Sequence, residues 1–258
     1  MARESNREGP VSAAVRRVSQ ILDAIAASPR GVTAAELAAR LKTSRQTAMR
    51  LLDSMVAAGM ALRDEETKRY RLGLVLYSWG SHAVASVLPN AAVRQELVSL
   101  AAEVSPHPIF YSVLDGISAV TLERTQVLDG TAITTPLNSR LHWPERPIGI
   151  AMAAFTDQET TQRLLDAPGP ANNGAEAADL PAVLKTTRER GYAELLFAPD
   201  RASFAAPVLD DSGYAAAAIG MGVNNYSPED HERLLAALRQ SALRCSNHLG
   251  YGVFMSAP

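Results

Sequence analysis

Residues 33–73 read TAAELAARLKTSRQTAMRLLDSMVAAGMALRDEETKRYRLG, and this stretch decides the fold of the first part of the chain. Thr33 with Glu36, and Thr43 with Gln46, form two capping-box patterns, in which a hydroxyl residue precedes an acid or amide by three positions. Each pattern stands just before an apolar-periodic run and therefore predicts a helix start. The stretch is expected to form two short helices joined by a four-residue junction.

The second of these helices has one apolar side. Ala48, Leu51, Leu52 and Met55 recur at the spacing i, i+3, i+4 and i+7, which places them on one face of a helix. The opposite face is rich in hydrogen-bond donors and holds Ser44, Arg45, Gln46, Met49, Arg50 and Asp53.

A short ribbon is expected after these helices. Gly59 ends the second helix, and residues 61–62 and 70–72 read as strands around the charged turn 64–69. Helix, turn, helix and a two-stranded ribbon with a basic tip are typical of a winged helix-turn-helix, in which the second helix enters the major groove and the wing meets the phosphate backbone. The base-facing candidates are Ser44, Arg45, Gln46, Thr47, Met49 and Arg50, and the phosphate candidates are Arg63, Lys68 and Arg69.

Charge is divided unequally along the chain. Residues 1–73 hold 13 Lys and Arg against 8 Asp and Glu, a balance of +5, while residues 74–258 hold 12 against 19, a balance of −7. A near-neutral protein that concentrates positive charge in one small domain is arranged to meet a polyanion there. Capped helix pairs also occur in proteins that never bind DNA, so the helices alone do not establish DNA binding. The charge asymmetry strengthens that interpretation.

Composition and length favour a two-domain protein of the cytoplasm. The chain has 258 residues, 47% of them hydrophobic and only 5% aromatic, which suits a small domain plus one of ordinary size with an aliphatic core. A single cysteine, Cys245, excludes an internal disulfide framework and fits a reducing compartment. The start is polar, and no apolar run reaches the ~18 residues of a membrane span. We expect a soluble cytoplasmic protein with a disordered tail over residues 1–10 and no membrane contact.

The segment after the wing reads as an apolar helix. Residues 74–87 (LVLYSWGSHAVASV) carry little charge and are followed by Pro89. An apolar helix between two domains usually meets a partner surface, so we expect a linker and a dimer contact here. The alternative is that this helix packs on the wing alone.

The rest of the chain alternates short apolar runs with helices. After an amphipathic helix over residues 91–104, turn signals such as Asp115-Gly116 separate strand-like runs, and helices are expected over 157–166 (capped by Thr156), 180–190 and 228–249. Residues 167–178 (APGPANNGAEAA) have no periodicity and are expected to form a mobile surface loop. This order predicts an α+β domain with an antiparallel sheet. Its strands are expected at residues 109–114, 119–122, 132–135, 192–197, 204–209 and 216–223.

Several motifs resemble those of one family. Residues 47–52 (TAMRLL), Gly59 and residues 69–73 (RYRLG) are similar to the T-x-x-R-L-L, G and Y-x-L-G elements of IclR-type bacterial transcriptional regulators. Residues 147–151 (PIGIA) resemble the family's G-K-A segment, with Ile150 in place of the usual Lys. Further matches are residues 190–193 (RGYA), 205–208 (AAPV) and 249–251 (LGY), so the resemblance covers about residues 15–251.

The resemblance implies a division of labour. A winged helix-turn-helix domain over residues 11–73 would be joined by a linker helix over residues 74–88 to a GAF-like effector-binding domain over residues 89–258. The protein would be a homodimer or tetramer that binds a pseudo-palindromic operator and responds to a small organic acid, and it would control a catabolic operon. The residues that the resemblance nominates for the effector pocket are Pro147, Ile148, Arg201, Ser203, Gly220 and Gly222.

Departures from the family pattern bear on the ligand. Gly220 and Gly222 stand on the last strand where binders of small acids often carry hydroxyls, which favours a larger and flatter ligand. Tyr111 and Trp143 are further lining candidates, with Phe110, Met152 and Met221, although ordinary core packing is the alternative for each.

No catalytic, cofactor or metal set is evident. Gly116-Ile117-Ser118 lacks the second glycine of a nucleophile elbow, and the Cys245 and His248 pair makes at most an incomplete metal site. Two alternatives remain open: an enzyme that uses the winged domain for protein contacts, and a ligand-free interaction protein.

Overall fold

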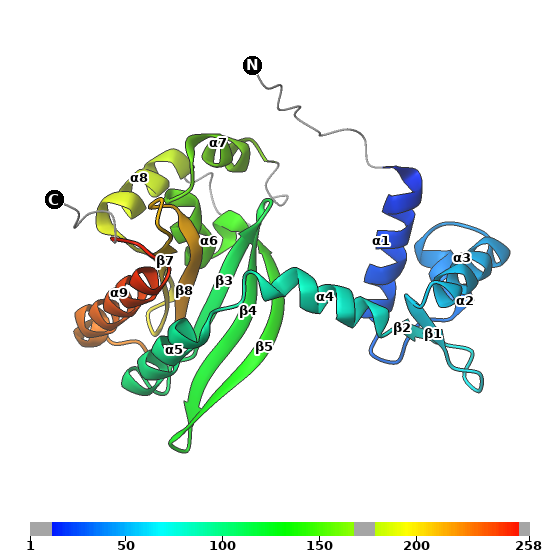
Figure 1. Cartoon of the computed structure of the whole chain (residues 1–258), viewed down its shortest axis with the longest axis horizontal. Coiled ribbons are helices and arrows are strands. Elements are labelled where there is room, and N and C mark those ends of the chain that lie inside the picture. Colours follow the sequence, from blue (N-terminus) through cyan, green and yellow to red (C-terminus); the bar gives the residue numbers. More distant parts are fainter. Residues whose placement is uncertain (1–11, 168–178, 253–258) are drawn as a thin grey trace. The chain divides into compact units, whose positions relative to one another are not determined.

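The computed structural model describes residues 12–167 and 179–252. The chain divides into two compact units, the first ending at Val87 and the second beginning at Leu88 (Figure 1). The tail expected over residues 1–10 and most of the loop expected over residues 167–178 lie outside the described residues.

The first unit is a winged helix-turn-helix, as the sequence predicted. Ile21 of α1, Leu37 of α2, Leu52 of α3 and Tyr70 of the wing meet in one apolar core, and each is at most 2% exposed. Strands β1 and β2 pair antiparallel, with Leu62 opposite Arg71. The elements of this unit are α1 (Ala13–Ala26), α2 (Ala34–Arg40), α3 (Arg45–Ala57), β1 (Ala61–Arg63), β2 (Tyr70–Leu72) and α4 (Val75–Ala85).

Two predicted helix starts have different outcomes. The capping box at the start of α2 is confirmed, because the Thr33 hydroxyl accepts from the Glu36 amide and the Glu36 carboxylate accepts from the Thr33 amide. The box predicted for Thr43 and Gln46 is wrong by one residue. The cap of α3 is Ser44, whose Oγ accepts from the Thr47 amide at 3.1 Å.

Helix α4 is apolar yet buries none of its residues. Tyr77 is 77% exposed and Trp79 is 52% exposed, and Leu74 just before the helix is 78% exposed. The alternative in which this helix packs on the wing alone therefore does not hold.

The second unit is an α+β domain around one antiparallel sheet, as predicted. The six strands lie in the order β5-β4-β3-β8-β7-β6, so the middle of the sheet is made by the first and last strands of the domain. The elements are α5 (Ala91–Glu103), β3 (Ile109–Asp115), β4 (Ser118–Leu128), β5 (Thr131–His142), η1 (Trp143–Glu145), α6 (Pro147–Ala154), α7 (Gln158–Asp166), α8 (Leu180–Arg190), β6 (Ala193–Ala198), β7 (Arg201–Leu209), β8 (Ala215–Asn224), η2 (Pro228–Asp230) and α9 (His231–His248).

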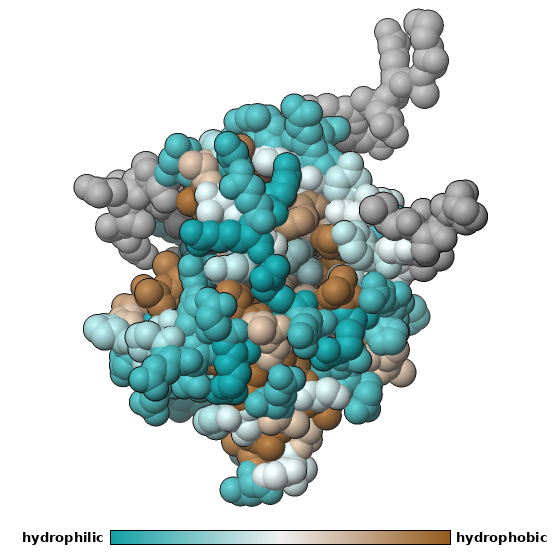
Figure 2. All heavy atoms as spheres, turned by 90° about the vertical axis from the view of Figure 1, so that its left-hand side faces the viewer, coloured by the Kyte–Doolittle hydropathy of each residue, from teal (hydrophilic) through white to brown (hydrophobic). Residues whose placement is uncertain are grey.

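The two faces of this sheet are covered differently. Successive residues of a strand point to opposite faces. On one face Tyr111, Phe204 and Ile219 pack with the apolar sides of α5 and α9 in the largest core cluster. On the other face Ala205 and Ala218 pack against α6, which is only eight residues long. The outer surface of the unit, around α8 and α9, is mostly hydrophilic with small apolar patches (Figure 2).

Two details of the helices differ from the sequence expectation. The cap of α7 is Asp157 rather than Thr156, because the Asp157 carboxylate accepts from the Thr160 amide at 2.9 Å. This bond lowers the pKa of Asp157. The closing helix begins with the short 3₁₀ turn η2, so α9 itself starts at His231.

We expect Gly149→Ala to destabilise the second unit. A Cβ at this position would lie 2.0 Å from the carbonyl oxygen of Trp143, and that backbone cannot move without shifting η1 and α6. The Cys245 thiol is buried and 0% exposed, so a thiol reagent reaches it only when this unit unfolds, and burial also raises the pKa of the thiol to about 12. The measurement is the urea midpoint for labelling of Cys245. Gly80→Ala is the control, because nothing lies within 4 Å of that position, and an unchanged midpoint for Gly149→Ala would contradict the prediction.

Candidate nucleic-acid interface and ligand cavity

Helix α3 presents a polar face built by its own periodicity. Ala48, Leu52 and Met55 are buried, which turns the opposite side of the helix outward. Arg45 and Arg50 are exposed there, and neither guanidinium forms an ion pair with any residue that the structure describes. Of the other candidates, Ser44, Gln46 and Met49 are exposed, and Thr47 is half-buried with its hydroxyl 2.9 Å from that of Ser44.

Two cations of the wing are already paired with an acidic neighbour. Lys68 Nζ lies 3.0 Å from Glu65 Oε2, and Arg63 Nε lies 3.8 Å from Glu65 Oε1. These contacts, with Lys68 first, lower the pKa of the Glu65 carboxyl. Asp64 and Glu66 add two further acids to the turn, so the tip is less basic than the sequence analysis assumed.

Arg69 has a structural role within the unit. Its Nη2 and Nη1 donate to Glu36 Oε1 and Oε2 at 3.0 and 3.1 Å, and Nη1 also donates to the carbonyl of Gly31 at 2.8 Å. The Glu36 pKa is lowered by the amide of Thr33 and then by Arg69. Arg69 therefore holds the wing to the start of α2.

Sequence reasoning missed Arg71, which is exposed and without an ion pair in the described chain. Its alternation with buried Tyr70 along the strand could have indicated that it points outward.

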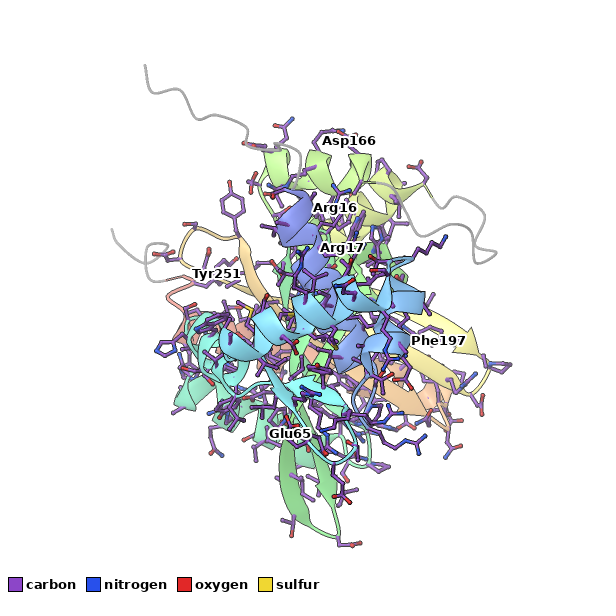
Figure 3. The ribbon with its side chains drawn as sticks, turned by 90° about the vertical axis from the view of Figure 1, so that its right-hand side faces the viewer. Arg16, Arg17, Glu65, Asp166, Phe197 and Tyr251 are labelled. Carbon is purple, nitrogen blue, oxygen red and sulfur yellow. The ribbon has the colours of Figure 1, made fainter. Side chains whose placement is uncertain are left out.

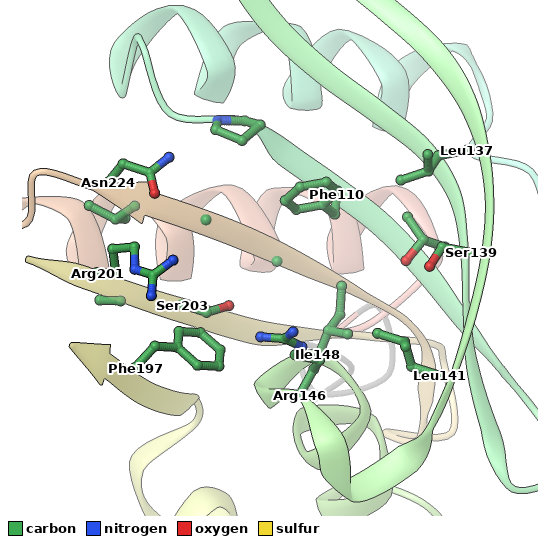
Figure 4. Close-up of a pocket in the computed structure, with 16 residues that line it drawn as sticks. Phe110, Leu137, Ser139, Leu141, Arg146, Ile148, Phe197, Arg201, Ser203 and Asn224 are labelled. Carbon is green, nitrogen blue, oxygen red and sulfur yellow. The ribbon is translucent and has the colours of Figure 1, made fainter.

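The second unit contains a cavity of about 540 Å³ on the face of the sheet that α6 covers (Figure 4). Its residues come from α6 and the residue before it, from the four inner strands and the residue before β3, and from the strands at both edges. They are Pro108, Phe110, Thr121, Leu137, Ser139, Leu141, Arg146, Ile148, Phe197, Arg201, Ala202, Ser203, Gly220, Gly222, Val223 and Asn224.

This cavity is positively charged and has two unlike ends. Arg146 and Arg201 line it with no acidic residue, and neither forms an ion pair within the described ranges. Arg201 and Asn224 lie towards one end, while Leu137 and Leu141 lie towards the other (Figure 4). The guanidinium of Arg146 stacks over the Phe197 ring at 4.6 Å from its centroid. The arrangement can accept an anionic group beside an apolar body.

Five of the eight predicted pocket residues line this cavity, and three do not. Ile148, Arg201, Ser203, Gly220 and Gly222 are brought together there. Tyr111 is not, because the alternation of strand β3 points it to the α5 and α9 face while Phe110 points to the cavity. The desolvated Tyr111 hydroxyl has its pKa raised to about 12.

Trp143 and Pro147 are also core residues, which removes them from the lining set. Trp143 is 1% exposed, and its indole nitrogen donates to the carbonyl of Leu164 at 2.9 Å, which joins η1 to α7. Pro147 is the buried first residue of α6. Of the further candidates, Met221 lies on the opposite face of the sheet, and Met152 is a fully buried residue of α6 that packs in the core between this helix and the sheet.

The two glycines of β8 act differently. A Cβ on Gly220 would lie 2.8 Å from Ile148 Cδ1, so this glycine lets α6 pack closely on the sheet. A Cβ on Gly222 would make only ordinary contacts with Phe110 and Pro108, so this position leaves room for a ligand.

Sequence reasoning missed the contribution of Arg146, Phe197 and the edge strand β5. Arg146 directly precedes the Pro147-Ile148 segment that was nominated, so its position in the sequence was a usable signal. Phe197 was expected only as the last residue of the strand 192–197. The three β5 residues, Leu137, Ser139 and Leu141, belong to a strand that extends well beyond the predicted residues 132–135, and no local signal identified them.

No group of three or more His, Cys, Asp or Glu residues that could hold a metal ion occurs in residues 12–167 and 179–252. Within the same ranges, no helix combines the length and apolarity needed to cross a membrane.

Comparisons with known proteins match both units. The MarR family matches residues 16–69, the winged helix-turn-helix region. The regulator KdgR of Escherichia coli is 24% identical over 247 residues, with 92% of each chain covered, and BhcR of Paracoccus denitrificans is 26% identical, with 93% of this chain and 87% of that protein covered.

Among solved structures, an IclR homolog from Microbacterium hydrocarbonoxydans, complexed with 4-hydroxybenzoate, matches with a TM-score of 0.71 at 20% identity. The match covers 92% of this chain and 98% of that one. The resemblance to IclR-type proteins is therefore confirmed over most of the chain, and the relatives KdgR and BhcR are HTH-type transcriptional regulators.

Loss of the Arg69 contacts should loosen the wing. We expect Arg69→Gln to speed amide exchange in β1 and β2, because the bonds to Glu36 and Gly31 tie these strands to the rest of the unit. Hydrogen-exchange mass spectrometry measures this. Lys68→Gln is the matched control, since its only side-chain partner in the described chain is the exposed Glu65, and equal exchange in both variants would refute the bracing role.

Proposed function

We propose that this protein is a DNA-binding transcriptional regulator whose operator affinity is set by a small organic acid. We also propose that it acts in the cytoplasm and controls a catabolic operon. The observation that carries the proposal is the exposed face of α3. It holds Arg45 and Arg50, which form no ion pair with the described residues, and the amide of Gln46, on a helix whose other side packs in the core. The relatives of the chain over both units are regulators, which supports the same function.

In this proposal α3 enters the major groove. Arg45 and Gln46 stand at its first turn, where a recognition helix contacts base edges. An arginine fork matches the O6 and N7 acceptors of guanine, and a glutamine amide matches adenine. Ser44, Thr47, Met49 and Arg50 complete the base-facing set. Arg63, Lys68 and Arg69 are the phosphate candidates of the wing, each already paired with an acid, and Arg71 is the wing cation without an ion pair among the described residues.

We propose a homodimer, or a tetramer built from it, that reads a pseudo-palindromic operator. The exposed apolar surface of α4, with Leu74, Tyr77 and Trp79, supports a contact between copies of the chain, because such a surface is costly to leave in water. A two-fold dimer presents two recognition helices to two half-sites, which explains the expected operator symmetry.

The effector is proposed to be an organic acid with an aromatic or otherwise apolar body. Arg201 and Arg146 offer cationic partners for a carboxylate, with Ser203 and Asn224 as polar neighbours. Phe110, Leu137 and Leu141 offer an apolar wall for the body. The related structure that contains 4-hydroxybenzoate supports a ligand of this class.

Replacing Arg45 by Ala should relax sequence preference. Loss of a bidentate base contact costs about 1–3 kcal/mol at one base position and little on unrelated DNA. Fluorescence anisotropy with the DNA upstream of the protein's own coding region, and with single-base variants of it, measures the change. Arg30→Ala, which removes an exposed arginine of the same unit outside α3, is the matched control. An unaltered preference profile for Arg45→Ala would show that this residue does not read bases.

Arg201→Gln should weaken ligand binding without harming the fold. A wild-type ligand present at 100 times its Kd raises the free energy of unfolding by about 2.7 kcal/mol, and loss of a charge-assisted contact removes much of this gain. A thermal-shift screen with aliphatic and aromatic carboxylic acids measures it. Arg163→Gln, an exposed change on α7 outside the cavity, is the control. A hit that shifts both variants and the wild type equally would place the ligand elsewhere.

A further inference from the structure

The first unit carries a second concentration of positive charge, away from the wing. A hollow of about 470 Å³ lies between the start of α1 and the turn that joins α2 to α3. Four cations line it, together with Gln20 and two apolar residues, and no acid is among the lining residues. The four are Arg16, Arg17, Arg40 and Lys42, and we call this feature the basic hollow.

The contacts of these four residues divide them into two pairs. Arg17 donates to the carbonyl of Leu41 at 3.3 Å, and Arg40 donates to the carbonyl of Ala24 at 2.9 Å, so both side chains brace the helices around the hollow. Arg16 and Lys42 are exposed, and neither side chain has a hydrogen-bond or ion-pair partner in the described part of the chain. Four like charges held together without an anion repel one another, and an anion that enters the hollow relieves this repulsion.

The wing tip does not offer a comparable site. Its turn contains three acids, and both Arg63 and Lys68 already reach Glu65. Arg69 is bound to Glu36, which leaves Arg71 as the wing cation without an ion pair in the described chain. A phosphate group approaching the tip meets carboxylates as well as cations.

The position of the basic hollow suits the backbone of a duplex read by α3. Lys42 stands two residues before Ser44, the cap of α3, so the hollow adjoins the end of the helix that carries Arg45 and Gln46. Arg16 and Arg17 lie at the end of the unit opposite to Glu65 of the wing, and helices α2 and α3 cross between them (Figure 3). A duplex lying along α3 would therefore present one stretch of backbone to the wing and another to the hollow.

We infer that the basic hollow binds phosphodiester groups of the DNA backbone and supplies the main backbone contact of this unit, ahead of the wing tip. This inference rests on the proposed function, since it assigns an additional contact to the same DNA-binding surface. The contact does not depend on base sequence, because backbone phosphates are the same at every step.

The test compares the double variant Arg16→Gln with Lys42→Gln against Lys68→Gln in the full-length chain. Anisotropy titrations use a 40-base-pair duplex from upstream of the coding region and a scrambled duplex of equal length, each at several salt concentrations. We expect the double variant to lose roughly tenfold in affinity on both duplexes. The negative slope of log K against log[salt] should become less steep by about 0.9 for each phosphate contact removed. Lys68→Gln should have a smaller effect on both quantities.

Two controls isolate the site. Arg163→Gln with Lys185→Gln removes the same net charge from exposed positions of the second unit and should leave the slope unchanged. Lys42→Arg keeps the charge and should retain wild-type affinity. Arg16 and Lys42 are chosen because they brace nothing in the described contacts, and an unchanged thermal melt confirms that the variant is folded.

Each outcome is decisive. If the wild type shows no salt-sensitive binding to either duplex, the proposed function itself fails, and this inference fails with it. If the wild type binds and the double variant matches it, only the hollow is excluded. If the double variant instead loses binding of inorganic phosphate, measured by calorimetry, while DNA affinity stays unchanged, the hollow is a site for free anions and the backbone assignment is wrong.

Discussion

A sheet has two faces to bury, and this chain covers them unequally. On one face, α5 and the 18-residue α9 meet Tyr111, Phe204 and Ile219 in a continuous core. On the other face, the eight-residue α6 covers only part of the sheet. The uncovered part is the cavity, so the ligand space follows from the length of one helix and from the close approach that Gly220 allows it.

Cations in this protein fall into two groups that differ in their partners. Some join elements of the scaffold: Arg69 pairs with Glu36, Arg94 with Glu123, and Arg244 with Glu96. Others have no acidic partner among the described residues. Some of these lie on α3, in the basic hollow and in the cavity, and others, such as Arg71 and Arg239, lie elsewhere. Exposed ion pairs contribute little to stability, whereas an unpaired cation keeps its full attraction for an external anion. The recognition helix, the basic hollow and the cavity are therefore proposed to bind anions through cations that have no acidic partner among the described residues.

The sequence predicted those features that depend on local pattern. The stripe of Ala48, Leu52 and Met55 fixed α3, and the strand-like runs located all six strands of the sheet, because period and turn residues are local signals. The predicted cap at Thr43 was wrong by only one residue, because the adjacent Ser44 also carries a hydroxyl that can cap a helix.

The cavity was harder to predict, because its walls come from distant strands whose side-chain direction depends on register. Tyr111 and Phe110 are adjacent, yet they point to opposite faces, and composition alone cannot say which one meets a ligand. The pairing of Arg63 and Lys68 with Glu65 depends likewise on turn geometry. A count of charges along residues 63–71 cannot reveal which cations are already neutralised.

A ligand in this cavity changes DNA affinity only if it binds one conformation of the protein better than another. A tenfold change corresponds to about 1.4 kcal/mol, comparable to a single charge-assisted hydrogen bond. Strands β7 and β8 are held by the buried core beneath them, so they are poor candidates for movement. Arg146, just before α6, and Phe197 of β6 are exposed by contrast, and the guanidinium stacks on the ring. A carboxylate that pairs with Arg146 would compete with its stacking on Phe197, and both side chains are exposed, so this contact can be exchanged without disturbing the buried core of β7 and β8.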